Sequence, residues 1–160
     1  MASSIDHEEI RLRPAEQPSP AEYWGDFYSW LMEQAAHVRA RRWEALDREN
    51  LAEEIESLGR EQFNKLESAL RVLLLHMLKW DHQPDRRSRS WWASITEQRL
   101  KLGDVLADNP GLRPRIDEAI TRAYRRARLR AIKATDVEES RFPETCPYTW
   151  HDIVSREFTR

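Results

Sequence analysis

The sequence contains few of the residues that interrupt helices, form disulfides or cross membranes. Only four of its 160 residues are glycine, and Cys146 is the single cysteine. One cysteine excludes an internal disulfide framework and is compatible with a reducing compartment. No apolar run approaches the length of a membrane span, and no basic segment followed by a hydrophobic run begins the chain. We therefore expect a cytoplasmic protein that is not inserted in a membrane.

Recognisable catalytic motifs are also missing. The chain has no phosphate loop, nucleophile elbow, zinc-spaced cluster or paired-carboxylate motif. Cys146 lies between Thr145 and Pro147 with no activating partner nearby in the sequence. These absences make an enzyme the less favoured class, and we predict no catalytic residue, cofactor or bound metal.

A long helical pattern from Asp47 to Trp80 is the strongest feature that is present. It contains no proline, and its apolar residues recur at steps of three and four, the spacing that places side chains on one face of an α-helix. These residues are Leu51, Ile55, Leu58, Phe63, Leu66, Leu70, Leu73, Leu74 and Met77. The pattern predicts one helix of about 50 Å at 1.5 Å per residue.

The other elements are also predicted to be helical. Capping residues and prolines place helices at about 19–42, 88–108, 112–135 and 149–158, with the last helix capped by Thr149. The prolines between Phe142 and Tyr148 predict an extended segment anchored by those two rings. The fold class predicted is all-α: an up-and-down bundle of four main helices plus a short C-terminal helix. Residues 1–18 are expected to form a disordered arm, and residues 19–160 a single bundle domain.

The first predicted helix carries many aromatic side chains. Its apolar stripe is expected to face the core of the bundle and comprises Tyr23, Trp24, Phe27, Trp30, Leu31, Gln34, Ala35 and Val38.

Charge is distributed unevenly along the chain, although the formal net charge is only −2. Residues 44–67 contain eight acids and three bases, whereas residues 86–133 contain thirteen bases and five acids. One interpretation is that the acidic and basic helices pair with one another or are solvated; the other is a basic surface that binds nucleic acid. The candidate basic surface, which lies partly beside Trp91 and Trp92, comprises Arg86, Arg87, Arg89, Arg122 and Arg126.

Four polar residues fall on or beside the predicted core faces and form a candidate polar core or site. Gln62 and His76 lie within the stripe of the long helix, where an imidazole is either satisfied internally or serves as a metal ligand. Arg99 lies at the edge of the third helix and Glu56 at the matching margin of the second, so we predict that they pair. An anion pocket formed by Arg99 and Gln98 is the alternative.

Several short phrases have the order and spacing of a known family. They are Asp26–Leu31, Asn50–Gly59, His76–Trp80, Arg87–Trp91 and Cys146–Thr149. Together they resemble the bacterial domain-of-unknown-function 29 family over nearly the whole chain, from Tyr23 to Phe158. The resemblance implies an all-α helical bundle, and it brings no established activity, cofactor or catalytic residue.

The function expected from the sequence is a protein-interaction or regulatory accessory module with an unidentified protein partner. The alternative is a nucleic-acid-binding protein that uses the arginine-rich second half. Homo-oligomerisation is left open.

Overall fold

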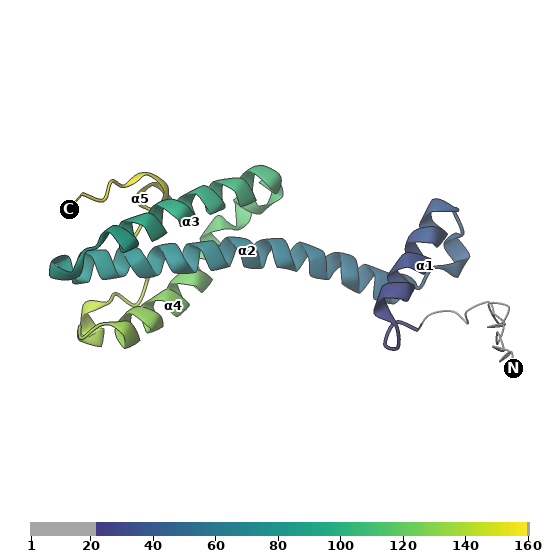
Figure 1. Ribbon diagram of the computed structural model, residues 1–160, viewed down its shortest axis with the longest axis horizontal. Helices are drawn as coiled ribbons and strands as arrows, with labels where there is room; N and C mark the ends of the chain where they lie inside the picture. The colour runs from purple at the N-terminus through teal and green to yellow at the C-terminus, as the bar shows by residue number, and fades with distance from the viewer. Residues whose placement is uncertain (1–21, 160) are drawn as a thin grey trace, which may run out of the picture. The chain divides into compact units, whose positions relative to one another are not determined.

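The computed structural model describes residues 22–159, and all regular elements in that range are helical (Figure 1). The α-helices are α1 (Phe27–Arg39), α2 (Arg48–His82), α3 (Arg89–Asp108), α4 (Ile116–Ala134) and α5 (Trp150–Ser155). Short 3-10 helices lie at Trp43–Ala45, Pro84–Arg86, Pro110–Arg115 and Glu139–Arg141. The predicted all-α class is confirmed.

The chain divides into two compact units, and the division falls inside α2 after Ile55. The described part of the first unit, residues 22–55, contains α1 and the first turns of α2; the second unit contains the rest of α2 together with α3, α4 and α5. The arm predicted for residues 1–18 lies outside the described residues. The single domain predicted for residues 19–160 stays a prediction.

The second unit has a dense apolar core built around α2. From Phe63 onward the stripe of α2 is buried, and Leu66, Leu70 and Leu73 have no exposed surface. The facing stripe of α4 consists mostly of small residues, and four of its alanines are fully buried: Ala119, Ala123, Ala127 and Ala131. Small side chains let two helix axes approach closely, so α4 can pack tightly on the larger side chains of the core.

The C-terminal segment is held on this core by its two predicted anchors. Phe142 is buried, and the hydroxyl of Tyr148 donates to Oδ2 of Asp81 on α2 at 2.8 Å. Both terminal nitrogens of Arg156 donate to the same carboxylate, at 2.9 and 2.6 Å. Thr149 then begins α5 with a capping box that it shares with Asp152. The predicted cap at Thr149 and the predicted anchors Phe142 and Tyr148 are confirmed.

Two predicted helix starts are wrong. α1 begins at Phe27, where the side chain of Asp26 caps it by accepting from the backbone N–H of Ser29 at 3.0 Å. The proposed start at Ser19 lies outside the described residues, but residues 22–26 form a turn rather than helix. α4 begins at Ile116 instead of Leu112, and the preceding residues Pro110–Arg115, which include Pro114, form a 3-10 helix.

Part of the predicted stripe on α2 is exposed. Ile55 and Leu58 have the helical phase of core residues, yet each is 61% exposed. Periodicity specifies which face of a helix a residue occupies, but it does not specify whether a neighbouring element covers that face.

Candidate functional site

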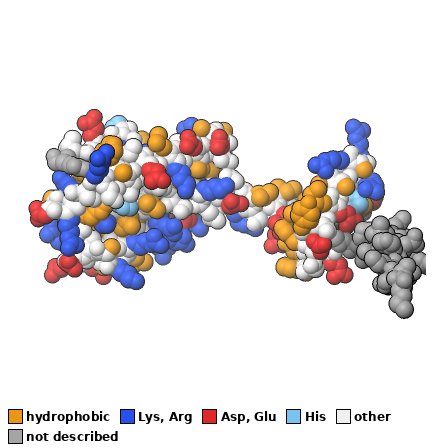
Figure 2. Space-filling model, in the orientation of Figure 1, with side chains coloured by type: hydrophobic (Ala, Val, Ile, Leu, Met, Phe, Trp, Pro, Cys, Tyr) orange, Lys and Arg blue, Asp and Glu red, His pale blue; other side chains and the backbone are white. Residues whose placement is uncertain are grey.

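The first unit presents a continuous apolar surface on α1. Phe27, Tyr28, Leu31 and Met32 are exposed, with Tyr28 at 73% and Met32 at 51%, and Trp24 just before the helix is 89% exposed. We call these five residues the α1 apolar face. Figure 2 shows hydrophobic side chains gathered on this unit. Large apolar side chains grouped on a surface are typical of interaction sites.

The breadth of the apolar arc on α1 explains this exposure. At about 100° per residue, the buried side chains of Trp30 and Gln34 lie together on one side of the helix. The exposed apolar side chains lie next to them and span about 140° of the helix surface, in the order Phe27, Leu31, Tyr28 and Met32. One neighbouring helix cannot cover so wide an arc. The prediction that the whole stripe faces a core is therefore wrong for Trp24, Phe27, Leu31 and Val38, all of which are exposed.

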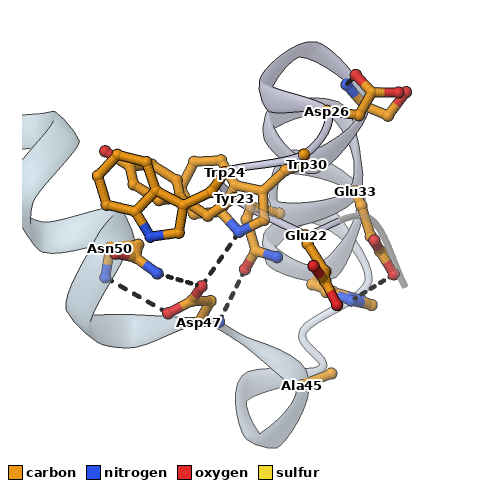
Figure 3. A pocket seen from close by; sticks show the side chains of 13 residues that line it. Glu22, Tyr23, Trp24, Asp26, Trp30, Glu33, Ala45, Asp47 and Asn50 are labelled. Carbon is orange, nitrogen blue, oxygen red and sulfur yellow. Dashed lines mark hydrogen bonds and ion pairs between the residues drawn. The ribbon is translucent and has the colours of Figure 1, made fainter. Parts of the chain in front are cut away.

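Asp47 fixes α1 against the start of α2 (Figure 3). Its carboxylate accepts from the indole N–H of Trp30 at 3.2 Å and from the side-chain amide of Asn50 at 2.7 Å. Its backbone N–H donates to Oε1 of Gln34 at 2.9 Å. The hydrogen bond from Asn50, with a smaller contribution from Trp30, holds the pKa of Asp47 below its usual value. The carboxylate therefore stays ionised as it joins the two helices.

Packed rings support the apolar face from beneath. Tyr23 meets Trp24 and Trp30 edge to face, with centroids 4.7 and 4.9 Å apart, and Phe27 stacks on Trp30 at 5.9 Å. The hydroxyl of Tyr23 donates to Glu54, and this bond is the main reason that its pKa is raised to about 12. Preorganised rings lose little conformational freedom on binding, so the face is suited to recognition.

A groove of about 1140 Å³ lies beside these rings. Its lining includes Tyr23, Trp24 and Trp30, four carboxylates and no lysine or arginine. The carboxylates belong to Glu22, Asp26, Glu33 and Asp47. Residues 22–55 contain eight acids and four bases, which gives this segment a formal charge of −4. Aromatic faces and carboxylates both attract cations, so the groove is complementary to lysine or arginine side chains.

The family model described as "Domain of unknown function DUF29" matches residues 23–159. The chain belongs to the DUF29 family. No curated protein matches it, and no solved structure matches it.

The pair predicted for Glu56 and Arg99 is wrong in this DUF29 member. Arg99 donates from Nε to the carbonyl of Ile153 at 2.7 Å and from Nη2 to that of Asp152 at 3.1 Å, so its guanidinium holds α5 against α3. Glu56 is exposed and pairs with Arg60 one turn away at 3.4 Å. Pairing between α2 and later helices does occur, but it involves Glu67 and Asp81. Helical phase alone could not identify which acid meets which base.

His76 and Gln62 lie on the inner side of α2 in the DUF29 fold, and both are partly buried. Nδ1 of His76 lies 2.8 Å from the carbonyl of Val72, which makes Nδ1 the protonated nitrogen, and burial lowers the pKa of the ring. Gln62 accepts from the ammonium group of Lys65 at 3.5 Å. Within residues 22–159, no three side chains of His, Cys, Asp or Glu lie close enough together to hold a metal ion.

The residues of the predicted basic surface fall into two places. Arg122 and Arg126 contact Glu67, whereas Nε of Arg87 donates to the carbonyl of Trp80 at 3.0 Å. Glu67 and Trp80 are thirteen residues apart on α2, or about 20 Å along its axis. Arg86 lies 3.9 Å from Asp136 and Arg89 is exposed. The five arginines therefore do not form one patch.

None of the helices within residues 22–159 combines the length and apolar character needed to cross a bilayer. Sequence reasoning missed Tyr28 and Met32 as surface residues. The signal that could have revealed them is the width of the apolar arc on α1, which exceeds what one neighbouring helix can bury.

Proposed function

We propose that this protein is an interaction module of the cytoplasm whose first unit binds a protein segment that carries both apolar and basic side chains. The observation that carries the proposal is the α1 apolar face lying in the same unit as a groove that is lined by four carboxylates and by no lysine or arginine; His37, which lies 3.6 Å from Glu33, is the one histidine in its lining. The partner's apolar side chains would cover the face, and its lysines or arginines would enter the groove.

The composition of the face supports a role in binding. Tryptophan, tyrosine and methionine are enriched at protein interfaces, and tryptophan and tyrosine are frequent hot spots. Trp24, Tyr28 and Met32 each expose half or more of their surface to water. Covering apolar surface contributes about 25 cal/mol per Å², so these side chains can supply a substantial part of a binding free energy.

The acidic groove gives the proposed partner its charge. Complementary charge speeds association and excludes partners of the wrong sign more than it adds affinity. A segment with acidic flanks would meet the carboxylates of Glu22, Asp26 and Glu33 and would be repelled.

Binding of labelled amphipathic helical peptides, measured by fluorescence anisotropy, tests this function. Three peptides share one leucine-rich face and differ only in their polar face, which carries lysine, glutamine or glutamate. The lysine peptide is expected to bind most tightly, and its affinity is expected to fall as salt rises from about 0.05 to 0.5 M. Equal binding of all three peptides, or preference for glutamate, contradicts the proposal.

Matched surface variants locate the binding site. Tyr28→Ser with Met32→Ser is expected to weaken binding of the lysine peptide by about tenfold or more. Leu100→Ser with Leu129→Ser is the control, because these leucines are 68% and 63% exposed but belong to the second unit. Sedimentation velocity of the same variants tests the alternative occupant: self-association that only the first pair abolishes identifies a second copy of the chain as the partner.

Nucleic-acid binding is the second candidate function. It is favoured by the charge of the second unit, in which nineteen bases exceed sixteen acids over residues 56–159. It is disfavoured by the internal contacts of Arg87, Arg122 and Arg126. Steeply salt-dependent RNA or DNA binding that Arg86→Gln with Arg89→Gln weakens would establish this candidate instead.

A further inference from the structure

A buried acid on α2 organises several arginines on the second unit. The side chain of Glu67 is only 5% exposed, and it pairs with Nε of Arg122 at 3.1 Å and with Nη1 of Arg126 at 2.9 Å. Both arginines belong to α4, where Figure 2 shows Lys and Arg side chains gathered. One carboxylate thus fixes two guanidinium groups that are themselves 46% and 60% exposed.

A third guanidinium lies at the same place without an acid. Arg71 donates from Nη2 to the hydroxyl of Ser68 at 3.2 Å, and its Nε is enclosed without a hydrogen-bond partner. Within residues 22–159 no carboxylate lies within ion-pair distance of Arg71. An enclosed N–H without an acceptor is uncommon in folded proteins.

These residues surround a small polar cavity of about 360 Å³. Its lining consists of Asn64, Glu67, Ser68, Arg71, Arg122 and Arg126. Three guanidinium groups and one carboxylate give the lining a formal charge of +2. The hydroxyl of Ser68 and the amide of Asn64 add neutral donors.

We propose that this cavity binds a phosphate group, with Arg71, whose guanidinium has no acid partner, as its principal ligand. Guanidinium groups match the oxygens of phosphate in pairs, and hydrogen bonds between two charged groups are the stronger kind. A dianion would balance the lining charge and would offer acceptors to the guanidinium of Arg71. Glu67 is a positioning residue, since it holds Arg122 and Arg126 in place. The proposal is independent of the interaction surface on the first unit.

Three phosphate compounds test the site and distinguish the possible sources of the group: inorganic phosphate, O-phosphoserine and adenosine 5′-monophosphate. Each is titrated into the full chain, and binding is followed by calorimetry and by the side-chain Nε–H resonance of Arg71. At least one compound is expected to bind and to shift that resonance. The compound that binds most tightly identifies a free ion, a phosphoprotein or a nucleotide as the source.

Arg71→Gln is the decisive variant, because it removes the guanidinium without disturbing the pairs made by Glu67. It is expected to weaken binding by about tenfold, whereas Arg125→Gln, an exposed residue of α4 that does not line the cavity, leaves binding unchanged. Circular dichroism confirms that both variants are folded. If none of the compounds binds, or if binding is the same in Arg71→Gln, the proposal is wrong.

Discussion

The two units use the same helix, α2, in opposite ways. In the second unit Leu66, Leu70 and Leu73 on α2 are fully buried, whereas in the first unit Ile55 is 61% exposed and the buried residues are Trp30 and Gln34 of α1. The second unit has the closely packed alanines of α4 to enclose the large side chains of α2. The first unit relies on hydrogen bonds to Asp47 and leaves much of its apolar surface in water. The contrast shows that the second unit buries its large apolar side chains in a core, whereas the first leaves several of them exposed.

The largest expected effect on stability comes from shortening a buried side chain of α2 in the second unit, compared with an exposed one in the first. Leu73→Ala should lower the free energy of unfolding by about 2–5 kcal/mol, because it leaves a cavity in a close-packed core. Ile55→Ala should change it by less than about 0.5 kcal/mol, since the side chain is largely exposed. Urea denaturation measures both. A large loss at Ile55 would mean that this face of α2 is covered in solution.

Removing the carboxylate of Asp81 tests how firmly the C-terminal segment contributes to the second unit. Asp81→Ala removes the carboxylate that accepts from the hydroxyl of Tyr148 and pairs with Arg156. It should lower the free energy of unfolding by about 2 kcal/mol, because both of these groups are partly buried. Asp85→Ala, in the exposed 3-10 helix that follows, is the matched control and should be close to neutral. A double-mutant cycle with Tyr148→Phe should show coupling; simple additivity would show that the bond contributes nothing.

Asp47→Ala is expected to loosen the first unit alone. It removes the side-chain contacts to Trp30 and Asn50 and also the cap of α2, in which Oδ1 of Asp47 accepts from the backbone N–H of Asn50 at 3.4 Å. Loss of a capping residue costs about 1 kcal/mol. Hydrogen exchange should accelerate in α1 and at the start of α2 and stay unchanged in α4. Faster exchange throughout residues 22–159 would instead support the single cooperative domain predicted from the sequence.

The smallest expected effect is a difference in the pH response of the two units. Burial lowers the pKa of His76 in the second unit, so the unfolded chain takes up a proton at higher pH than the folded chain. Stability contributed by neutral His76 is complete above the ordinary pKa of 6.5 and declines as pH falls toward the lower folded value. Burial shifts His82 in the same direction.

Asp47 responds in a different pH window. Its folded pKa is also lowered, so its contribution is present above the ordinary value of 3.8 and is lost as pH falls through the folded pKa. Denaturation at a series of pH values should therefore show a decline below about pH 6.5 that His76→Gln reduces and Asp47→Asn does not. An unchanged slope in His76→Gln would mean that this ring does not carry the effect.

Local features of the sequence predicted much of the architecture. The all-α class, the cap of α5, the core stripe from Phe63 onward and the anchors Phe142 and Tyr148 were all accessible, because caps, prolines and helical phase act within a few residues of the chain. The partners of Glu67, Arg99 and Asp81 were not accessible, because they lie far along the chain and depend on how the helices pack.

The candidate surface shows the same limit most clearly. By itself the sequence determined that α1 is apolar over a wide arc and that charge is segregated along the chain. Only the tertiary structure decided which part of that arc is covered, that the acids of the first unit lie beside exposed rings, and that Arg71 lies among arginines without an acid of its own. The physical reason is that a side chain's periodicity depends on its own helix, whereas its burial and its charge partner depend on the elements packed against that helix.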